Sequence, residues 1–263
     1  MARVLVISSH VTHGNVGLTA TVPALQGLGH EVWPLPTVLL ASRPGLGRMA
    51  RHAVPATELA AMLAALEADG GWPLLDAVLT GYFPSPEAVI AAADAISRIK
   101  HAKPGITVMV DPILGDAGAL YVSEPTAHAL RDHLLPLATL ATPNLFELHW
   151  LARSAVDDRA MIEAAVARLG TPSVVVTSAE QGADRIATLL VSSSRTTAFQ
   201  SPRHPDIPKG TGDVFAGLLL GFLLDGRDQD SAIVSALDAL DGILTESEGR
   251  PVLQLSTLLK GAG

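Results

Sequence analysis

The 263-residue sequence contains no cysteine, which excludes disulfide bonds and any thiolate metal site. A basic run of residues is also absent, and the net charge is −8. Binding to nucleic acid depends on clustered Lys and Arg side chains. Composition therefore argues against nucleic acid as the main partner.

Long hydrophobic runs are missing too. No segment approaches the roughly 20 apolar residues that a membrane-spanning helix needs. The first apolar run, Val4 to Ile7, is too short for the core of a signal peptide, and no small-residue cleavage site follows it. We therefore expect a soluble, cytoplasmic protein.

Two common nucleotide-binding motifs do not occur. The N-terminal glycines do not form Gly-x-Gly-x-x-Gly, and no segment matches Gly-x-x-x-x-Gly-Lys-Ser/Thr. These absences exclude a dinucleotide-binding fingerprint and a Walker-type phosphate loop. Because no Pro/Gly/Ser-rich linker, repeat or low-complexity tract divides the chain, we expect one domain over residues 1–263.

Hydrophobic residues make up 48% of the sequence, enough for a large core. Strand and helix patterns alternate through most of the chain, which predicts an α/β fold with a mainly parallel sheet and helices on both faces. The first strand is expected at Val4–Ile7, with a loop at Ser8–His10, and the second at Glu31–Leu35, broken by prolines. Residues 34–55 are expected to form a flap over a site.

The remaining elements follow from apolar periodicity and turn residues. Thr57 is expected to cap a helix that runs to Ala68. Later strands are expected at 76–80, 107–110, 139–141 and 173–177, and helices near 86, 125–134, 145–152 and 157–169. After residue 177 the pattern predicts antiparallel strands at 186–191 and 196–199, then helices at 212–224, 229–245 and 253–259.

The segment Pro208-Lys209-Gly210-Thr211-Gly212-Asp213 leads straight into an apolar helix. A Gly-Thr-Gly turn at a helix start points backbone N–H groups outward at the positive end of the helix dipole, which suits a phosphate. Asp213 adds a carboxylate beside that anion, and phosphoryl transfer to an alcohol needs both. Taken alone, the segment is explained equally well by helix capping through Thr211 or Asp213.

Polar residues follow the predicted strands at their carboxyl ends, where ligands bind in open α/β sheets. The set is Ser9, His10, Thr80, Tyr82, Asp111, Asp116, Thr142, Asn144, Glu147, Thr177 and Ser178. Three carboxylates with amide and hydroxyl oxygens suit a hard cation such as Mg²⁺. Singly, each has a simpler explanation, such as a turn aspartate or, for Asn144 and Glu147, a capping box. Together, however, these residues are expected at the same edge of the sheet as the Gly-Thr-Gly-Asp turn, and this favours a functional site.

Together these motifs resemble the pyridoxal kinases of the ribokinase-like superfamily, over nearly the whole chain. The landmarks are Ser9-His10-Val11 with Gly14 and Gly17, Leu79-Thr80-Gly81-Tyr82, Asp111-Pro112 with Gly115-Asp116, Tyr121-Val122, Thr142-Pro143-Asn144 with Phe146-Glu147, Thr177-Ser178 and Gly210-Thr211-Gly212-Asp213. The resemblance implies a ribokinase-like three-layer sandwich and ATP-dependent phosphorylation of the 5′-hydroxymethyl group of pyridoxal. It also implies a homodimer whose flap covers the site.

The resemblance implies a role for each residue of the catalytic turn and the substrate pocket. Asp213 would take the proton of the substrate hydroxyl. The N–H groups of Gly210, Thr211 and Gly212 would hold the charge on the transferring phosphoryl group. Ser9 would hydrogen-bond the pyridine ring, and Tyr82 would line the same pocket.

The resemblance also implies the cofactors. Mg²⁺ and a supporting monovalent cation, K⁺, would be placed by four residues, Asp111, Asp116, Thr142 and Glu147. The ATP phosphates would be contacted by Asn144, Thr177 and Ser178, directly or through water, and Asp111 and Glu147 would reach them through the metal.

The flap departs from the pattern Ser-Asn-His-Thr that many members of the family carry. Here the stretch is Ala41-Ser42-Arg43-Pro44-Gly45-Leu46, so Pro44 replaces a threonine that would face the substrate, and Arg43 replaces a histidine. The motifs therefore indicate the type of reaction more clearly than they indicate the substrate. Two alternatives stay open: a kinase for another hydroxymethyl heterocycle, such as hydroxymethylpyrimidine, and a protein that binds ATP or a vitamer without turnover.

Overall fold

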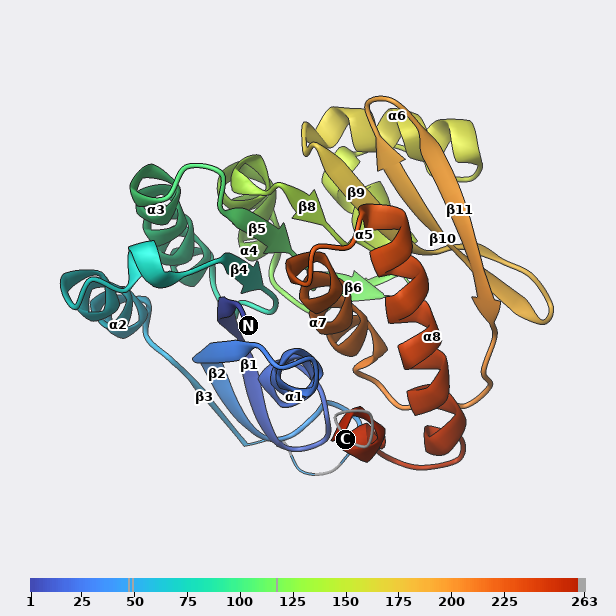
Figure 1. The fold of residues 1–263 in the computed structure, drawn as a ribbon, viewed down its shortest axis with the longest axis horizontal. Coiled ribbons are helices and arrows are strands. Elements are labelled where there is room, and N and C mark those ends of the chain that lie inside the picture. The colour runs from blue at the N-terminus through green and yellow to red at the C-terminus, as the bar shows by residue number, and fades with distance from the viewer. Residues whose placement is uncertain (47, 49, 117, 260–263) are drawn as a thin grey trace.

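The computed structural model describes residues 1–46, 48, 50–116 and 118–259. Within these residues, nine strands form one sheet in the order β11-β10-β9-β8-β5-β4-β1-β2-β3 (Figure 1). The six strands from β9 to β2 run parallel to one another. The remaining strands β3, β10 and β11 are each joined to the sheet by antiparallel pairing. The predicted α/β class, with a mainly parallel sheet, is confirmed.

The nine strands are β1 (Arg3–His13), β2 (Glu31–Ser42), β3 (Arg51–Ala53), β4 (Ala77–Thr80), β5 (Thr107–Val110), β8 (Leu140–Ala141), β9 (Ser173–Gln181), β10 (Arg185–Ser192) and β11 (Thr196–Pro202). A separate small hairpin consists of β6 (Gly115–Asp116) and β7 (Ala119–Leu120). The α-helices are α1 (Leu18–Gly27), α2 (Ala56–Ala68), α3 (Pro86–Ala102), α4 (Glu124–Ala129), α5 (Leu145–Ala152), α6 (Arg159–Leu169), α7 (Thr211–Leu224) and α8 (Gln229–Ser247). Shorter helical segments are η1 (Trp72–Leu74), η2 (Leu130–Leu134), η3 (Leu135–Leu137) and η4 (Leu255–Leu259).

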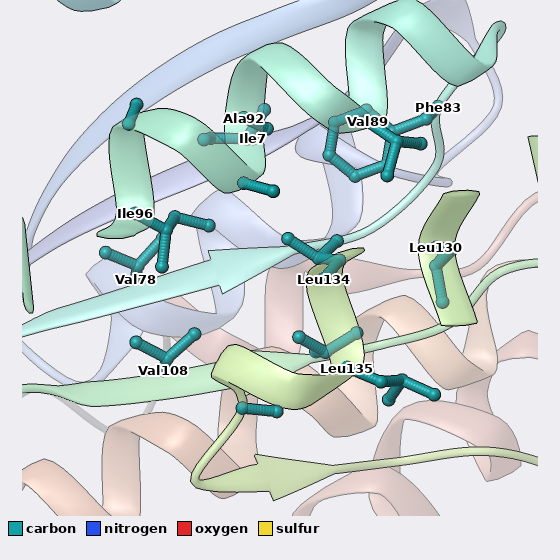
Figure 2. Packing of buried hydrophobic residues seen from close by; sticks show 14 of the residues in the cluster. Ile7, Val78, Phe83, Val89, Ala92, Ile96, Val108, Leu130, Leu134 and Leu135 are labelled. Atoms are coloured by element: carbon teal, nitrogen blue, oxygen red, sulfur yellow. The ribbon is translucent and has the colours of Figure 1, made fainter. Parts of the chain in front are cut away.

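The two faces of the sheet are covered by different helices because successive side chains on a strand point to opposite sides. In β1, Leu5 and Ile7 join a core formed with α2, α3 and η2, part of which Figure 2 shows. The alternate residues Val4 and Val6 join a second core formed with α1, α7 and α8. Burial on both faces explains why these strands read as continuous apolar runs.

The structure corrects the predicted ends of the first two strands. Ser8 to His10 do not form a loop, because β1 continues to His13 alongside β2. Pro34 and Pro36 do not end β2 either. Since β3 pairs only with residues 38–40 of β2, the prolines lie where β2 has no second neighbour, and a missing N–H is tolerated there.

The predicted flap at 34–55 is built largely as a hairpin of β2 and β3, with Val38 opposite Ala53. Positions 47 and 49 of the flap lie outside the described residues. Thr57 does not cap α2, whose N-cap is Pro55 and whose start has no side-chain capping bond. The other predicted elements are confirmed to within a few residues, although the last predicted helix is the short segment η4.

The small β6–β7 hairpin was not expected from the sequence, because each of its strands has only two residues. Residue 117, between the two strands in the sequence, lies outside the described residues.

No helix in the described part of the chain is both long and apolar enough to cross a membrane.

Candidate active site

The Gly-Thr-Gly-Asp turn starts α7 and requires glycine at its first position. Gly210 has φ 110°, and a Cβ placed on it would stand 2.0 Å from the backbone carbonyl oxygen of Asn15. Helix α7 begins at Thr211 with no side-chain cap at its N-terminus. The capping explanation for Thr211 and Asp213 is therefore wrong. A helix start without a side-chain cap and preceded by a tight glycine turn is suited to an anion.

Asp213 lies in the first turn of α7, next to the loop between β1 and α1. Its carboxylate accepts a hydrogen bond from the N–H of Gly17, and its carbonyl accepts one from the Thr21 hydroxyl at 3.2 Å. Burial raises the pKa of Asp213 to about 6, and the Gly17 hydrogen bond opposes that rise. A carboxyl with a pKa near neutrality is suited to general-base chemistry.

Asp111 follows β5 and is buried near Asp213. Burial, together with the negative charge of Asp213, raises the pKa of Asp111 to about 8. The hydroxyl of Thr142, which follows β8, donates to Asp111 Oδ1 at 2.9 Å and opposes the rise. The structure therefore brings Asp111 and Thr142, at the carboxyl ends of the neighbouring strands β5 and β8, close to Asp213 at the start of α7.

Glu147 and Asn144 form a true capping box at the start of α5. The buried Glu147 carboxylate accepts from the N–H groups of Asn144 at 2.9 Å and Leu114 at 3.0 Å. The Asn144 amide donates to the Gly115 carbonyl at 3.0 Å, so the pair also holds the segment that follows β5. Burial, and after it the charge of Asp111, raises the pKa of Glu147 well above its usual range.

Asp116, in β6, differs from the other predicted metal ligands because its side chain is 53% exposed. The ammonium nitrogen of Lys209 lies 3.3 Å from Asp116 Oδ2 and 3.4 Å from the Tyr121 hydroxyl. This ion pair connects the β6–β7 hairpin with the residue that precedes Gly210. No motif in the sequence pointed to this role of Lys209.

In the part of the chain that the structure describes, no group of three or more His, Cys, Asp or Glu side chains could hold a metal ion. The predicted set Asp111, Asp116, Thr142 and Glu147 is therefore not a closed protein cage. Mg²⁺ usually keeps several waters and takes only one or two carboxylates plus substrate phosphates. Burial, and after it the charge of a neighbouring carboxyl, raises the pKa values of Asp111 and Glu147, so a cation would be stabilised here.

Ser9 lies within β1, and Tyr82 follows β4, the strand that pairs with β1. Ser9 is buried, and a Cβ on Gly17 would meet its Oγ at 2.3 Å, so Gly17 packs directly against it. Tyr82 is half-buried, and burial raises the pKa of its phenol, whereas the charge of Arg51 in β3 opposes this.

Two hydroxyls that the sequence analysis missed fix the backbone of Tyr82. The Ser8 hydroxyl accepts from the Tyr82 N–H at 3.1 Å, and the buried Thr37 hydroxyl donates to the Tyr82 carbonyl at 2.7 Å. Ser8 precedes the predicted Ser9, but only the strand geometry shows which of the two faces Tyr82. No sequence motif pointed to Thr37, because it falls in the predicted flap, for which no secondary structure was expected.

Two residues of the predicted flap lie at the end of β2 and in the connection to β3. Pro44 is exposed in this connection. The guanidinium of Arg43 donates to the carbonyl of Pro251 at 2.8 Å, so this side chain ties the hairpin to the C-terminal segment. His10 is exposed in β1.

Thr177 and Ser178 lie where β9 bulges. The pairing of β9 with β10 shifts between Ala187 and Leu189, and Ser178 has a left-handed φ of 53°. Such irregularities in a strand re-aim side chains near functional sites. Here both residues line a cavity of about 250 Å³ that also contacts Thr211 and Gly212.

This cavity lies between the β9–β11 edge of the sheet and helices α7 and α8. Its floor is apolar, with Ile186, Phe215, Leu237, Leu240 and Leu244 among its lining residues. Its polar rim includes His204 and Asp241. A flat apolar group could enter while a linked anion reaches the start of α7. Thr177, Ser178, Thr211 and Gly212 were expected at the site from the sequence, whereas the other lining residues were not.

The family model described as phosphomethylpyrimidine kinase matches residues 13–250. The chain belongs to this family. Its relatives include the pyridoxal kinase PdxY of Corynebacterium diphtheriae, 34% identical, with 88% of this chain and 84% of the relative covered. A pyridoxine/pyridoxal/pyridoxamine kinase of Bordetella avium is 36% identical, with 88% and 80% covered.

The family is also evident in the fold. The pyridoxal kinase from Leishmania donovani in complex with ADP and pyridoxamine has a TM-score of 0.90 and 29% identity, covering 99% of this chain and 95% of that one. The predicted resemblance to this group of kinases, and the prediction of an enzyme, are confirmed.

Proposed function

We propose that the protein transfers the γ-phosphoryl group of ATP to the 5′-hydroxymethyl group of pyridoxal, giving pyridoxal 5′-phosphate and ADP. Asp213 takes the hydroxyl proton while the hydroxyl oxygen forms its bond to the γ-phosphorus. The bond from that phosphorus to the β–γ bridging oxygen breaks, and ADP leaves. The loose transition state of phosphoryl transfer is stabilised mainly by positioning and charge.

The observation that carries this proposal is the start of α7. Gly210 to Gly212 present backbone N–H groups with no side-chain cap, and Asp213 stands one residue further with a pKa raised to about 6. The N–H groups hold the charge of the transferring phosphoryl group, and Asp213 holds the proton. A protein that only binds ATP or a vitamer has no use for a carboxyl with these properties.

We assign the cavity beside the turn to the nucleotide. Its apolar floor accepts the base, and Thr177 and Ser178 on the β9 bulge contact the phosphates together with Asn144. Asp111, Asp116, Thr142 and Glu147 would place Mg²⁺ and a monovalent cation, K⁺. The carboxyls of Asp111 and Glu147 are buried beside other negative charge. The magnesium ion neutralises phosphate charge when bound.

The substrate ring is assigned to the opposite side of Asp213, between Ser9 and Tyr82 and under the β2–β3 hairpin. Pro44 is assigned to the same substrate pocket because it lies in the connection of this hairpin. Relatives named for pyridoxal, pyridoxine and pyridoxamine favour a B6 vitamer. A hydroxymethylpyrimidine is the second candidate, because the family model is described by a phosphomethylpyrimidine kinase and the hairpin departs from the pyridoxal kinase pattern.

A panel of acceptors tests the proposal. Purified protein with ATP and Mg²⁺ is assayed for ADP release and phosphorylated product with pyridoxal, pyridoxine, pyridoxamine and hydroxymethylpyrimidine. We expect turnover with at least pyridoxal. Turnover of the pyrimidine alone would replace the first candidate by the second, and ATP binding without turnover of any acceptor would favour a binding protein.

Three further assignments belong to the same proposal. The sheet runs without interruption from β3 to β11, which supports one domain over residues 1–263. A homodimer and a cytoplasmic location follow the family expectation. Analytical ultracentrifugation of the purified protein tests the dimer.

A further inference from the structure

His204 occupies a position that the reaction chemistry does not use. It lies in the segment between β11 and α7, and its side chain is only 10% exposed. Its Nε2 lies 2.7 Å from Asp241 Oδ1, and its Nδ1 lies 2.9 Å from Glu248 Oε1. Asp241 is on α8, and Glu248 is the residue that ends this helix.

Both ring nitrogens therefore face carboxylate oxygens, which can only accept hydrogen bonds. A neutral imidazole has one donor, whereas the imidazolium has two, so this geometry selects the charged ring. Burial by itself lowers the pKa of His204, but the hydrogen bonds and charges of Asp241 and Glu248 outweigh it and raise the pKa. The neighbouring Arg203 turns away and donates to the Gly182 carbonyl at 3.2 Å.

The bridge is part of the wall of the cavity assigned to the nucleotide. His204 and Asp241 line that cavity, together with Arg203 and Ile207 of the same segment. Six residues after His204 the chain reaches Gly210 and the catalytic turn. Glu248, in contrast, is not among the lining residues, so it contacts His204 without facing the cavity.

We propose that His204 is a positioning residue for ATP: as an imidazolium bridging Asp241 and Glu248, it holds residues 203–207 against α8 and so fixes one wall of the nucleotide cavity. The inference rests on the proposed function, because it takes the cavity to be the ATP site. A largely buried ring that is paired with two carboxylates holds a segment more firmly than a single exposed ion pair does.

Glu248→Gln is the decisive variant because it removes the negative charge of one partner of the bridge without changing the lining of the cavity. We expect KM for ATP to rise roughly three- to tenfold, while kcat and KM for the vitamer change less than about twofold. His204→Gln should give the same pattern. Asp241→Asn is less informative, because its side chain could also meet the nucleotide directly.

Arg195→Gln is the matched control. Arg195 forms a two-point ion pair with Asp230, which also joins the β10–β11 edge to α8 but near the other end of that helix. Neither residue lines the cavity. This variant should leave KM for ATP unchanged, and thermal melting should show that all the variants are folded.

The outcomes separate the two proposals. If the wild type turns over no acceptor, the proposed function fails, and ATP affinity measured by calorimetry on the same variants still tests the bridge. A folded Glu248→Gln protein with wild-type ATP affinity overturns the inference. An equal loss of affinity in Arg195→Gln overturns it as well, because any weakened contact with α8 would then have the same effect.

Discussion

The two ends of the proposed active site are built in different ways. At the phosphoryl end, Asp213 and Glu147 accept from backbone N–H groups, and negative charge acts from Asp213 on Asp111 and from Asp111 on Glu147. At the substrate end, the β2–β3 hairpin contacts Tyr82 through Thr37, and its connection exposes Pro44. The first end is a buried electrostatic assembly, whereas at the second β2 is paired along β1 but β3 and the connection are exposed.

The difference indicates where change is tolerated. Moving a buried carboxyl or a glycine of the turn disturbs several groups at once, because each is held by more than one neighbour. A change in an exposed hairpin connection disturbs little beyond the residue itself. A chain can therefore keep its reaction while its hairpin sequence departs from that of its relatives.

The largest effect is expected from Asp213→Asn. The amide cannot accept the hydroxyl proton, so kcat should fall about a thousandfold, while the nearly equal shape leaves ATP binding intact. Asp225→Asn, at the other end of α7, is the control and should keep full activity. Steady-state kinetics and calorimetric ATP binding measure both properties. Full activity in Asp213→Asn would remove this residue from the mechanism.

Gly210→Ala should have the next largest effect. Its φ of 110° disfavours any side chain, and the added methyl would overlap the Asn15 carbonyl. We expect a loss of activity of about a hundredfold, because a displaced turn no longer aims its N–H groups at the phosphoryl group. Gly226→Ala has a similar backbone conformation, φ 86°, with open space around it. Equal losses in the two variants would mean that backbone strain, and not contact with Asn15, is decisive.

The sequence could bring the residues of the phosphoryl end together because they belong to local motifs. Gly210 to Asp213 are consecutive, Asp111 and Thr142 each follow an apolar strand, and Thr177 follows the apolar run at the start of β9. Parallel strands bring such residues to one edge without any knowledge of side-chain contacts. The capping box of Asn144 and Glu147 was also predictable from its spacing, as one of two explanations.

The substrate end could not be predicted in the same detail. Pro34 and Pro36 suggested that the strand ends early, although a strand without a second neighbour tolerates them. Thr37 and Ser8 hydrogen-bond the backbone of Tyr82, which lies 45 and 74 positions away from them in the sequence. No local pattern reveals such a contact. The His204 bridge depends likewise on pairing between a loop and a distant helix.

The pH dependence of the free energy of unfolding should distinguish the two ends of the proposed active site. Asp111 has a pKa of about 8 in the folded chain, far above its value in the unfolded chain, so its contribution to stability is present in acid and is lost as the pH rises through about 8. Without metal, the free energy of unfolding should fall by roughly 2 kcal/mol between about pH 6 and pH 8 from this group. Chemical denaturation of wild type and Asp111→Asn measures it.

The Asp111→Asn variant should show a flatter profile, with a residual slope of the same sign from Glu147, Asp213 and His204, whose raised pKa values also make them stabilising only while protonated. Tyr82 adds no slope, because burial raises the pKa of its phenol beyond this range. Profiles with equal slopes in the two proteins would show that Asp111 does not titrate there.

The smallest effect is expected from Thr37→Val, which tests how the hairpin holds the substrate end. The variant keeps the shape of a fully buried side chain but removes the hydrogen bond to the Tyr82 carbonyl. KM for the vitamer should rise roughly three- to fivefold, with kcat and KM for ATP unchanged, because only the wall that faces the ring loosens. Thr57→Val, exposed on α2, is the control. A fall in kcat with an unchanged KM would mean that this hydrogen bond supports the catalytic end instead, and the two ends would then not be independent.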